Sequence, residues 1–340
     1  MILWCIFFIL FGGLRWNVGG DWDQYHDHFL FSSWSNIFNY DRYGNGDEKL
    51  EPGFVFFNVL IKTIFQKFWI YNIIVVSIIE YAYYKFCIYF CPEHPLVPFV
   101  MVNMSVLFPV RAGLSMAFVY MAYKYIKERN LIMFLVFTLI GTALHNQCIV
   151  ILPLYWIGHV KLKDWMLLIL YIVFAFSTYM LQDYFISLML MFGGSIADKA
   201  LGYTMNETEG FKGASYIGWV LNFFFLLIYL YVAKKEKSRQ TYWTNTLING
   251  FLLYMLIFFA FQDGMGDLAR LAGLFYPMQI ILFANAYSYF KDKKKGILAI
   301  LATLFVFSYF TYKWTGIGSG YFFKETCVPY KTVFDYNFPN

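Results

Sequence analysis

The chain has 340 residues, of which 60% are hydrophobic and only 14% are charged, and its formal net charge is +5. A soluble domain usually carries about 25% charged residues, so most of this chain is not expected to face water. The basic residues stand in short clusters between apolar runs instead of covering one continuous face, which argues against a nucleic-acid-binding protein. The composition predicts an all-α, polytopic membrane protein.

Apolar runs typical of membrane helices recur along the whole chain. A stretch of about 20 such residues crosses a bilayer core unaided. The runs are 1–14, 69–90, 95–108, 112–126, 130–143, 146–158, 165–183, 216–233, 243–261, 270–290 and 296–313. Because several of them are short, we expect about 10–12 spans, some of them hairpin-like, in a transmembrane helical bundle with an outward-facing cavity. The bundle is expected to be a single polytopic domain over residues 1–340.

Four short basic clusters give the expected orientation. Cytoplasmic loops of membrane proteins are enriched in Lys and Arg, so we expect all four on the cytoplasmic side. They lie at 124–129, 161–163, 234–239 and 291–295. The chain must then cross an even number of times between successive clusters. This parity places residues 15–68, 184–215 and the tail 314–340 on the outward side, with 53–68 as an amphipathic helix at the membrane interface.

The same parity predicts two hairpins. Between two basic clusters, the run 130–158 is interrupted only by the polar residues that begin at His145. Arms of about 14 residues span only ~20 Å, so the tip at His145 would lie recessed in a cavity. The run 95–126 repeats this pattern, with its tip at Arg111. The alternative is one long tilted helix at each place, which would put one basic cluster outside.

Ionisable groups at the edge of a membrane are costly and by default mark a function. Arg111 and Arg270 each open an apolar helix, where a guanidinium beside free backbone N–H groups forms an anion site. The alternative is a structural ion pair with an acid such as Asp21. Histidine is the residue type whose ordinary pKa lies near neutrality, so His145 is a candidate general base, although a lone His in an apolar run is also typical of a hydrogen-bonded core residue.

Two motifs in the outward region carry further candidates. The segment RWNVGGDWDQY, residues 15–25, holds Arg15 and Asp21 together with three aromatic rings suited to stacking on sugars, those of Trp16, Trp22 and Tyr25. The segment EPGF begins with Glu51, a carboxylate that suits the positive end of a helix. An interfacial loop and a plain helix start are the structural alternatives. No metal-ligand cluster, nucleotide-binding loop or hydrolase motif is present, so neither a metal nor a cofactor is expected.

These motifs, in this order, resemble the EpsG family of bacterial exopolysaccharide and capsule proteins, which is grouped with the Wzy-like repeat-unit polymerases. The resemblance rests on RWNVGGDWDQY, EPGF, Arg111, ALHNQCIVILPLYW with His145, Arg270 and the final VPYKTVF. Gly20 stands where members usually carry Thr, and Asn146 stands where a basic or polar residue is usual. Neither departure removes an ionisable group.

The resemblance implies a metal-independent glycosyltransferase at the outer face of the bacterial cytoplasmic membrane. Its donor would be an oligosaccharide on undecaprenyl diphosphate, and it would join lipid-linked repeat units into exopolysaccharide, capsule or O-antigen. Arg111 and Arg270 would hold the diphosphate with help from Arg15, and the base would be His145, Asp21 or Glu51. The implied partners are the lipid-linked donor and acceptor, the bilayer, and a chain-length regulator and flippase of the same pathway.

Two other functions remain open at this point. A transporter or flippase of lipid-linked sugars would place polar residues near the midplane, often within internal repeats, and no such repeat is visible. A membrane-bound glycan acyltransferase could use His145 and Asn146 for acyl transfer, but no second polar centre lies on the expected cytoplasmic side.

Overall fold

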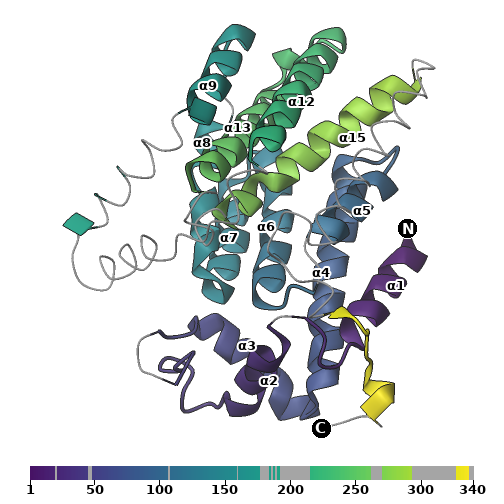
Figure 1. The fold of residues 1–340 in the computed structure, drawn as a ribbon, viewed down its shortest axis with the longest axis vertical. Helices are drawn as coiled ribbons and strands as arrows, with labels where there is room; N and C mark the ends of the chain where they lie inside the picture. Colours follow the sequence, from purple (N-terminus) through teal and green to yellow (C-terminus); the bar gives the residue numbers. More distant parts are fainter. Residues whose placement is uncertain are drawn as a thin grey trace. The chain divides into compact units, whose positions relative to one another are not determined.

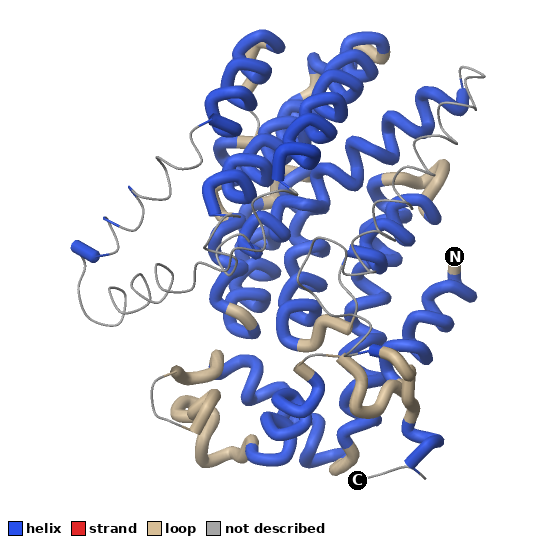
Figure 2. Tube along the Cα trace, viewed as in Figure 1, coloured by secondary structure: helices blue, strands red, loops and turns tan. Residues whose placement is uncertain are grey.

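The computed structural model describes most of the chain. The described residues are 1–19, 21–44, 48–105, 108–158, 160–176, 215–261, 270–292 and 327–336, with four single positions between 184 and 191. Over these ranges the chain is helical and has no strand beyond two isolated bridges, which confirms the all-α fold class (Figure 2). The predicted span 296–313, most of the loop 184–215 and much of the tail 314–340 lie outside the described residues.

The described helices form two compact units. The first unit comprises Met1–Leu152 and Phe322–Asn340, and the second comprises Pro153–Tyr321. The single polytopic domain and the outward-facing cavity stay predictions.

Three described helices are long and apolar enough to cross a membrane. They are Phe68–Phe90, Gly218–Lys235 and Tyr242–Phe261. Shorter apolar helices of 10–17 residues accompany them, in line with the expectation that some spans are short. The chain is a multi-pass helical membrane protein.

The first unit is built on a long central helix. Its elements are α1 (Ile2–Gly13), α2 (Trp22–Phe31), α3 (Pro52–Phe65), α4 (Phe68–Phe90), α5 (Leu96–Ser105), α6 (Arg111–Lys127), α7 (Leu131–Leu144), η1 (Asn146–Ile151) and η4 (Val333–Tyr336). Helix α4 packs against α1 and α6, and α6 packs along α7 (Figure 1). Gly13 permits the close approach of α1, because a Cβ there would lie 2.8 Å from Ile73 Cγ1. Helices α2 and α3 lie at one end of α6 and α7.

Helix α2 was not predicted. It falls within residues 15–52, which were expected to be loop, and polar residues at Asp23, Gln24 and Asp27 obscure its pattern. Trp22 and Phe29 are buried, which gives the helix one packed face. Its stability therefore comes from tertiary packing and not from a strong local signal.

Both predicted hairpin tips coincide with breaks in the helices. Helix α7 ends at Leu144, His145 is extended (φ −157°, ψ 114°), and η1 then packs against α7. In the other run, α5 ends at Ser105, and Phe108 adopts a positive φ of 58° before α6 begins. The alternative of one continuous tilted helix at each place is therefore wrong.

The C-terminal segment 327–336 is tied to the end of α1. The Trp16 N–H donates to the Lys331 carbonyl at 3.0 Å, and the Val333 N–H donates to the Leu14 carbonyl at 2.9 Å. The final VPYKTVF motif thus belongs to the same unit as the first motif of the chain.

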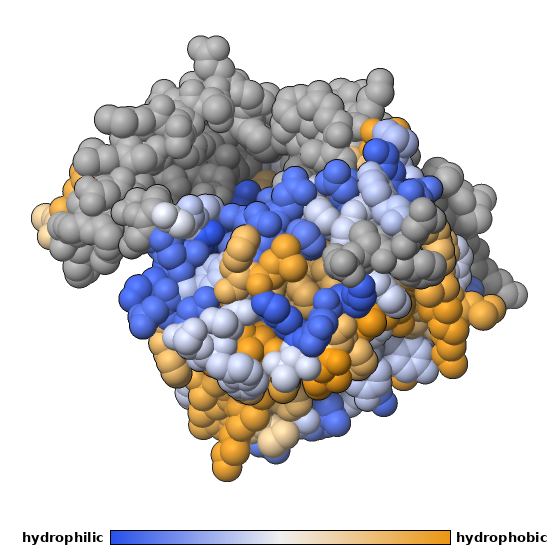
Figure 3. Space-filling model, turned by 90° about the horizontal axis from the view of Figure 1, so that it is seen from below, coloured by the Kyte–Doolittle hydropathy of each residue, from blue (hydrophilic) through white to orange (hydrophobic). Residues whose placement is uncertain are grey.

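The face around α2, α3 and the segment between them is amphipathic. Figure 3 shows hydrophilic and hydrophobic side chains next to one another on the end of the molecule seen from below. Large exposed apolar side chains on these elements include Phe31, Trp34, Phe38, Phe56 and Ile64. Such a surface suits the headgroup region of a bilayer, the place expected for residues 53–68.

The second unit is arranged around α13. Its elements are α8 (Leu154–Ile157), α9 (Asp164–Phe176), α12 (Ser215–Lys235), η2 (Ser238–Gln240), α13 (Tyr242–Phe261), η3 (Arg270–Phe275) and α15 (Tyr276–Asp292). Asn249 on α13 holds the turn after α8 through hydrogen bonds from Nδ2 to the carbonyls of Gly158 and Val160, at 2.9 and 2.7 Å. Gly250 permits close packing of α15, because a Cβ there would lie 2.5 Å from Met278 Cγ.

The helix expected over 270–290 is not a single element. Residues Arg270–Phe275 form a 3₁₀ turn, and the α-helix begins only at Tyr276. Pro277 accounts for the boundary, since proline has no N–H to bond to the preceding turn and is favoured in the first turn of a helix. Arg270 therefore opens a 3₁₀ turn and not an α-helix.

Candidate functional site

Glu51 joins two residues that the sequence placed in separate hairpin tips. Its Oε2 accepts a hydrogen bond from Arg111 Nη1 at 3.0 Å, and its Oε1 accepts one from His145 Nδ1 at 2.8 Å. The backbone N–H of Asn146 also donates to Oε1, at 3.2 Å. The side chains of Glu51, Arg111 and His145 are only 7%, 10% and 15% exposed. We call these three residues the Glu51 cluster.

Each member of the cluster stands at the end of a helix. Glu51 is the N-cap of α3, and Pro52 follows it in the first turn, where a missing N–H costs nothing. Arg111 is the first residue of α6, and His145 is the C-cap of α7. Rigid helices thus fix all three side chains, which is the arrangement that a precise site requires.

Gly53 allows the helix ends to meet. A Cβ at this position would lie 2.5 Å from the Ala143 carbonyl oxygen, inside the last turn of α7. Any side chain would push α3 away from α7 and lengthen the bond between Glu51 and His145. The glycine of the EPGF motif is therefore required by close backbone approach.

The environment of Glu51 favours its ionised form. Burial by itself opposes ionisation, but the hydrogen bond from His145 and the charge of Arg111 outweigh it and lower the pKa of Glu51 to about 2. The carboxylate is therefore charged at neutral pH and balances Arg111. It can accept hydrogen bonds but cannot donate them.

The ionised carboxylate determines which nitrogen of His145 carries the proton. Because Glu51 only accepts, Nδ1 must donate to it, and in the neutral ring Nε2 then holds the lone pair. Within the described part of the chain, Nε2 has no hydrogen-bond partner. This nitrogen is available to take a proton from a ligand.

Arg111 has donors left over after it binds Glu51. Its Nε–H is buried and has no hydrogen-bond partner among the described residues. A buried, unsatisfied guanidinium donor is costly, and an anionic ligand would offset that cost. The cluster thus presents an anion-binding group and a proton acceptor on the two sides of one carboxylate.

Two residues of α2 approach Arg111. Burial raises the pKa of Tyr25, and the nearby charge of Arg111 partly offsets that rise. Burial, followed by the charges of Arg111 and Arg42, lowers the pKa of His28 to about 4. His28 is therefore neutral at neutral pH, and its Nδ1 lies 3.3 Å from the Tyr40 hydroxyl. His28 was missed from the sequence because nothing indicated that α2 packs near Arg111.

Arg15 serves the architecture of the first unit. Its Nη1 donates to the Val18 carbonyl at 2.7 Å, and its Nη2 donates to the Phe108 carbonyl at 3.4 Å. The guanidinium carbon also lies 4.7 Å from the centre of the Phe108 ring. Phe108 comes three residues before Arg111, so Arg15 supports the turn from which α6 begins.

The other outward candidates lie apart from the cluster contacts. Asp21 is exposed and caps α2 by position, without a side-chain hydrogen bond to the helix. Trp16 and Trp22 are buried, and their ring centres are 4.8 Å apart. His26 stacks on Trp22 at 5.0 Å. Contact of either indole with a sugar would require this aromatic core to open.

Arg270 belongs to the second unit, whereas the three residues of the Glu51 cluster belong to the first. Its role in holding a diphosphate stays a prediction.

Glu80 is a further ionisable residue, and it belongs to none of the motifs described above. It lies in the middle of α4, is buried, and accepts a hydrogen bond from Asn103 Nδ2 at 3.3 Å. The available signal was a lone carboxylate within an apolar span, which is costly in a membrane. Over the described residues, no group of three or more His, Cys, Asp or Glu side chains is placed to hold a metal ion.

The sequence matches the model of the EpsG family over residues 1–332. No curated protein and no solved structure matches it. The family match spans both motifs of the first unit and the whole second unit. The chain therefore belongs to the EpsG family, a membership that suggests a role of the exopolysaccharide-polymerase type.

Proposed function

We propose that this protein polymerises oligosaccharide repeat units carried on a polyprenyl diphosphate, at the outer face of the bacterial cytoplasmic membrane. The growing glycan leaves its carrier and joins the sugar of an incoming lipid-linked repeat unit. The observation that carries the proposal is the bridge through Glu51, which pairs a cation suited to diphosphate with an imidazole suited to a hydroxyl.

The cluster accounts for both demands of the reaction. The acceptor hydroxyl loses its proton to His145 Nε2 as its oxygen bonds to the anomeric carbon of the donor. The bond between that carbon and the diphosphate oxygen breaks, and the diphosphate leaves with the electron pair. Arg111 stabilises the negative charge that develops on the leaving group. In this scheme Arg270 is a second diphosphate ligand, and Asp21 contributes at the acceptor.

Glu51 is a positioning residue in this mechanism. It holds the His145 ring in the tautomer that leaves Nε2 free, and its charge stabilises the imidazolium formed by proton transfer. It also orients Arg111 while leaving the buried Nε–H for a ligand. A single carboxylate thus sets the geometry of the acid–base group and the anion-binding group together.

Substitution of single residues in the producing bacterium tests the proposal. His145→Ala and Arg111→Ala should each abolish long polysaccharide, while the lipid-linked single repeat unit accumulates on the outer face of the membrane. Lys85→Ala, at an exposed position of α4 outside the cluster, is the matched control and should leave polymer length unchanged. Expression in the membrane is checked by immunoblotting.

Three outcomes would contradict the proposal. Polymer of normal length from both variants would show that the Glu51 cluster takes no part in the reaction. Repeat units trapped on the cytoplasmic face would indicate a flippase instead. Glycan of normal length that lacks acyl groups, measured by mass spectrometry, would indicate an acyltransferase.

A further inference from the structure

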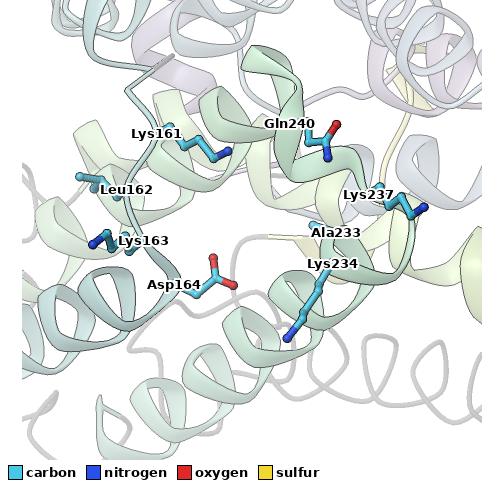
Figure 4. A pocket seen from close by; sticks show the side chains of 8 residues that line it. All are labelled: Lys161, Leu162, Lys163, Asp164, Ala233, Lys234, Lys237 and Gln240. Atoms are coloured by element: carbon cyan, nitrogen blue, oxygen red, sulfur yellow. The ribbon is translucent and has the colours of Figure 1, made fainter.

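A hollow of about 530 Å³ lies in the second unit, where the segment before α9 faces the end of α12 (Figure 4). None of its lining residues belongs to a motif used for the proposed function. Its lining residues are Lys161, Leu162, Lys163, Asp164, Ala233, Lys234, Lys237 and Gln240. We call it the lysine hollow.

The charge of the lysine hollow is strongly unbalanced. Four lysines line it, and Asp164 is its one acidic lining residue. Across the described ranges, none of these four ammonium groups forms an ion pair with a carboxylate. Four cations gathered around one cavity repel one another, and an anion placed among them would relieve that repulsion. The charge therefore favours an anionic ligand.

The directions of the side chains distinguish between kinds of anion. In Figure 4, Lys161 extends toward Gln240, and the Asp164 carboxylate faces the space between the two segments. The amines of Lys163 and Lys237 point away from that space along its rim. A free polyphosphate held tightly would need ammonium groups that converge on it. Cations spread around a rim suit a headgroup that lies at the membrane surface.

The helices that flank the hollow carry apolar faces suited to lipid chains. Asp164 at the start of α9 and Lys234 near the end of α12 line the same hollow. Farther along α9, the Tyr171 hydroxyl donates to the Trp219 carbonyl near the start of α12 at 2.7 Å, so the two helices run antiparallel. Asp164 at the start of α9 and Lys235 at the end of α12 therefore lie at the same end of the pair. The outer faces of both helices expose large apolar side chains: Trp165, Ile169, Ile172 and Val173 on α9, and Val220, Phe224, Leu227 and Tyr231 on α12.

The aromatic residues place this end of the pair at headgroup depth. Trp165 directly follows the acid of the hollow, and Tyr231 precedes Lys234 by about one helical turn. Trp and Tyr are enriched where the hydrocarbon core meets the headgroups. A lipid at this position would have its phosphate at the hollow and its acyl chains along α9 and α12.

We propose that the lysine hollow is a binding site for the phosphate headgroup of an anionic membrane lipid. The positive-inside rule explains why lysines occur in these two loops, but it does not require them to enclose a cavity. The site lies on the side expected to be cytoplasmic, and it does not depend on the polymerase proposal. Its role is to anchor the second unit to anionic bilayers and stabilise it there.

Lipid binding by the purified full-length protein tests this inference. Native mass spectrometry and thermal unfolding are measured in uncharged detergent with added phosphatidylglycerol or phosphatidylcholine. The test variant carries Lys→Gln at Lys161, Lys163, Lys234 and Lys237. The control variant carries the same change at four lysines that line no part of the hollow, Lys85, Lys124, Lys127 and Lys291.

Phosphatidylglycerol should bind the wild type in preference to phosphatidylcholine and raise its unfolding temperature. Neutralising a lysine near an anionic headgroup should weaken binding roughly fivefold, so the test variant should lose the preference that the control variant keeps. Asp164→Asn removes the opposing charge and should tighten binding, and this single change serves where the fourfold variant does not fold.

The inference is overturned by any of three results. Equal loss of the preference for phosphatidylglycerol in the two fourfold variants would mean that binding depends on the total charge of the protein and not on the hollow. Unchanged phosphatidylglycerol binding in both the test variant and Asp164→Asn would exclude the hollow as the binding site. Binding of inorganic diphosphate by the lipid-free protein, with the same sensitivity to these lysines, would assign the site to a free phosphate compound.

Discussion

Oε1 of Glu51 lies 2.8 Å from Nδ1 of His145, although 94 positions separate the two residues in the sequence. The same carboxylate holds Arg111 through its other oxygen. A carboxylate shared in this way couples Arg111 and His145, because a movement of either residue also shifts the carboxylate that the other one binds. The proposed mechanism therefore predicts that the three residues act as a unit.

That coupling can be measured with a double-mutant cycle. Glu51→Gln keeps the size of the side chain but loses its charge, and its amide would oppose a donor of Arg111. We expect Glu51→Gln and His145→Gln each to reduce polymer formation by about 10²–10⁴-fold, the usual contribution of general acid–base catalysis. The double variant should be little slower than the slower single variant. The measurement is the rate at which purified protein elongates a lipid-linked repeat unit.

Multiplicative effects of the two substitutions would contradict the coupling. Asn245→Ala, in the second unit and outside the cluster, provides the comparison, since its effect should combine multiplicatively with that of His145→Gln.

The low pKa of Glu51 makes the stability of the folded protein depend on pH in the acid range. The pKa falls from its ordinary value of 4.5 to about 2 in the folded chain, so the unfolded chain binds more protons between these two values. The stabilisation from Glu51 is therefore complete above about pH 4.5 and is lost as the pH falls toward 2. Thermal unfolding in detergent between pH 3 and 7 measures it. Glu51→Gln should unfold at a lower temperature at pH 7 and show a smaller further decrease toward pH 3.

His28 makes a second pH-dependent contribution to the stability of the folded protein, at a higher pH than Glu51 does. Its pKa is lowered to about 4 in the folded protein, so the unfolded chain takes up the proton first as the pH falls below about 6.5. Comparison of the variants Glu51→Gln and Glu51→Gln/His28→Gln separates the contribution of His28 to stability from that of Glu51. An identical loss of stability between pH 6.5 and 4 in both variants would mean that His28 contributes nothing.

Gly53→Ala tests whether the contact between α3 and α7 positions the cluster. The new Cβ would lie 2.5 Å from the Ala143 carbonyl oxygen, so α3 must move away and carry Glu51 with it. We expect a destabilisation of about 1–3 kcal/mol, as for other overpacked sites, together with a loss of polymer formation. Gly218→Ala is the control, because no atom lies within 4 Å of its added Cβ. Similar effects of the two substitutions would remove the special role of Gly53.

Much of the helical framework could be predicted because local patterns determine it. The ends of α4, α6, α7 and α13 agree with the apolar runs to within one or two residues, and the breaks at Arg111 and His145 follow from polar residues in apolar surroundings. Parity of the basic clusters correctly favoured interrupted helices over continuous ones. These features depend on residues close together in the sequence.

The pairing within the site could not be predicted in the same way. Glu51 was a candidate for the base, but contacts across 60 and 94 positions depend on how α3 packs on α6 and α7. Helix α2 was missed because its short apolar face is interrupted by acids, and His28, which lies on this helix, was missed with it. Arg15 was expected at the diphosphate, whereas it donates hydrogen bonds to the backbone carbonyls of Val18 and Phe108, which no side-chain pattern reveals.

Arg15→Lys distinguishes a positioning role from a diphosphate-binding role. A lysine keeps the charge but cannot donate in two directions as the guanidinium does, so the bond to Phe108 or that to Val18 is lost. Loss of a charged hydrogen bond and of the contact with the Phe108 ring should destabilise the protein by about 2 kcal/mol. Because the turn before Arg111 loses its support, kcat should fall while KM for the lipid-linked substrate changes little. Thermal unfolding and steady-state kinetics on the purified variant give both quantities. A raised KM with unchanged unfolding temperature would instead mean that Arg15 leaves its carbonyl partners to bind the diphosphate.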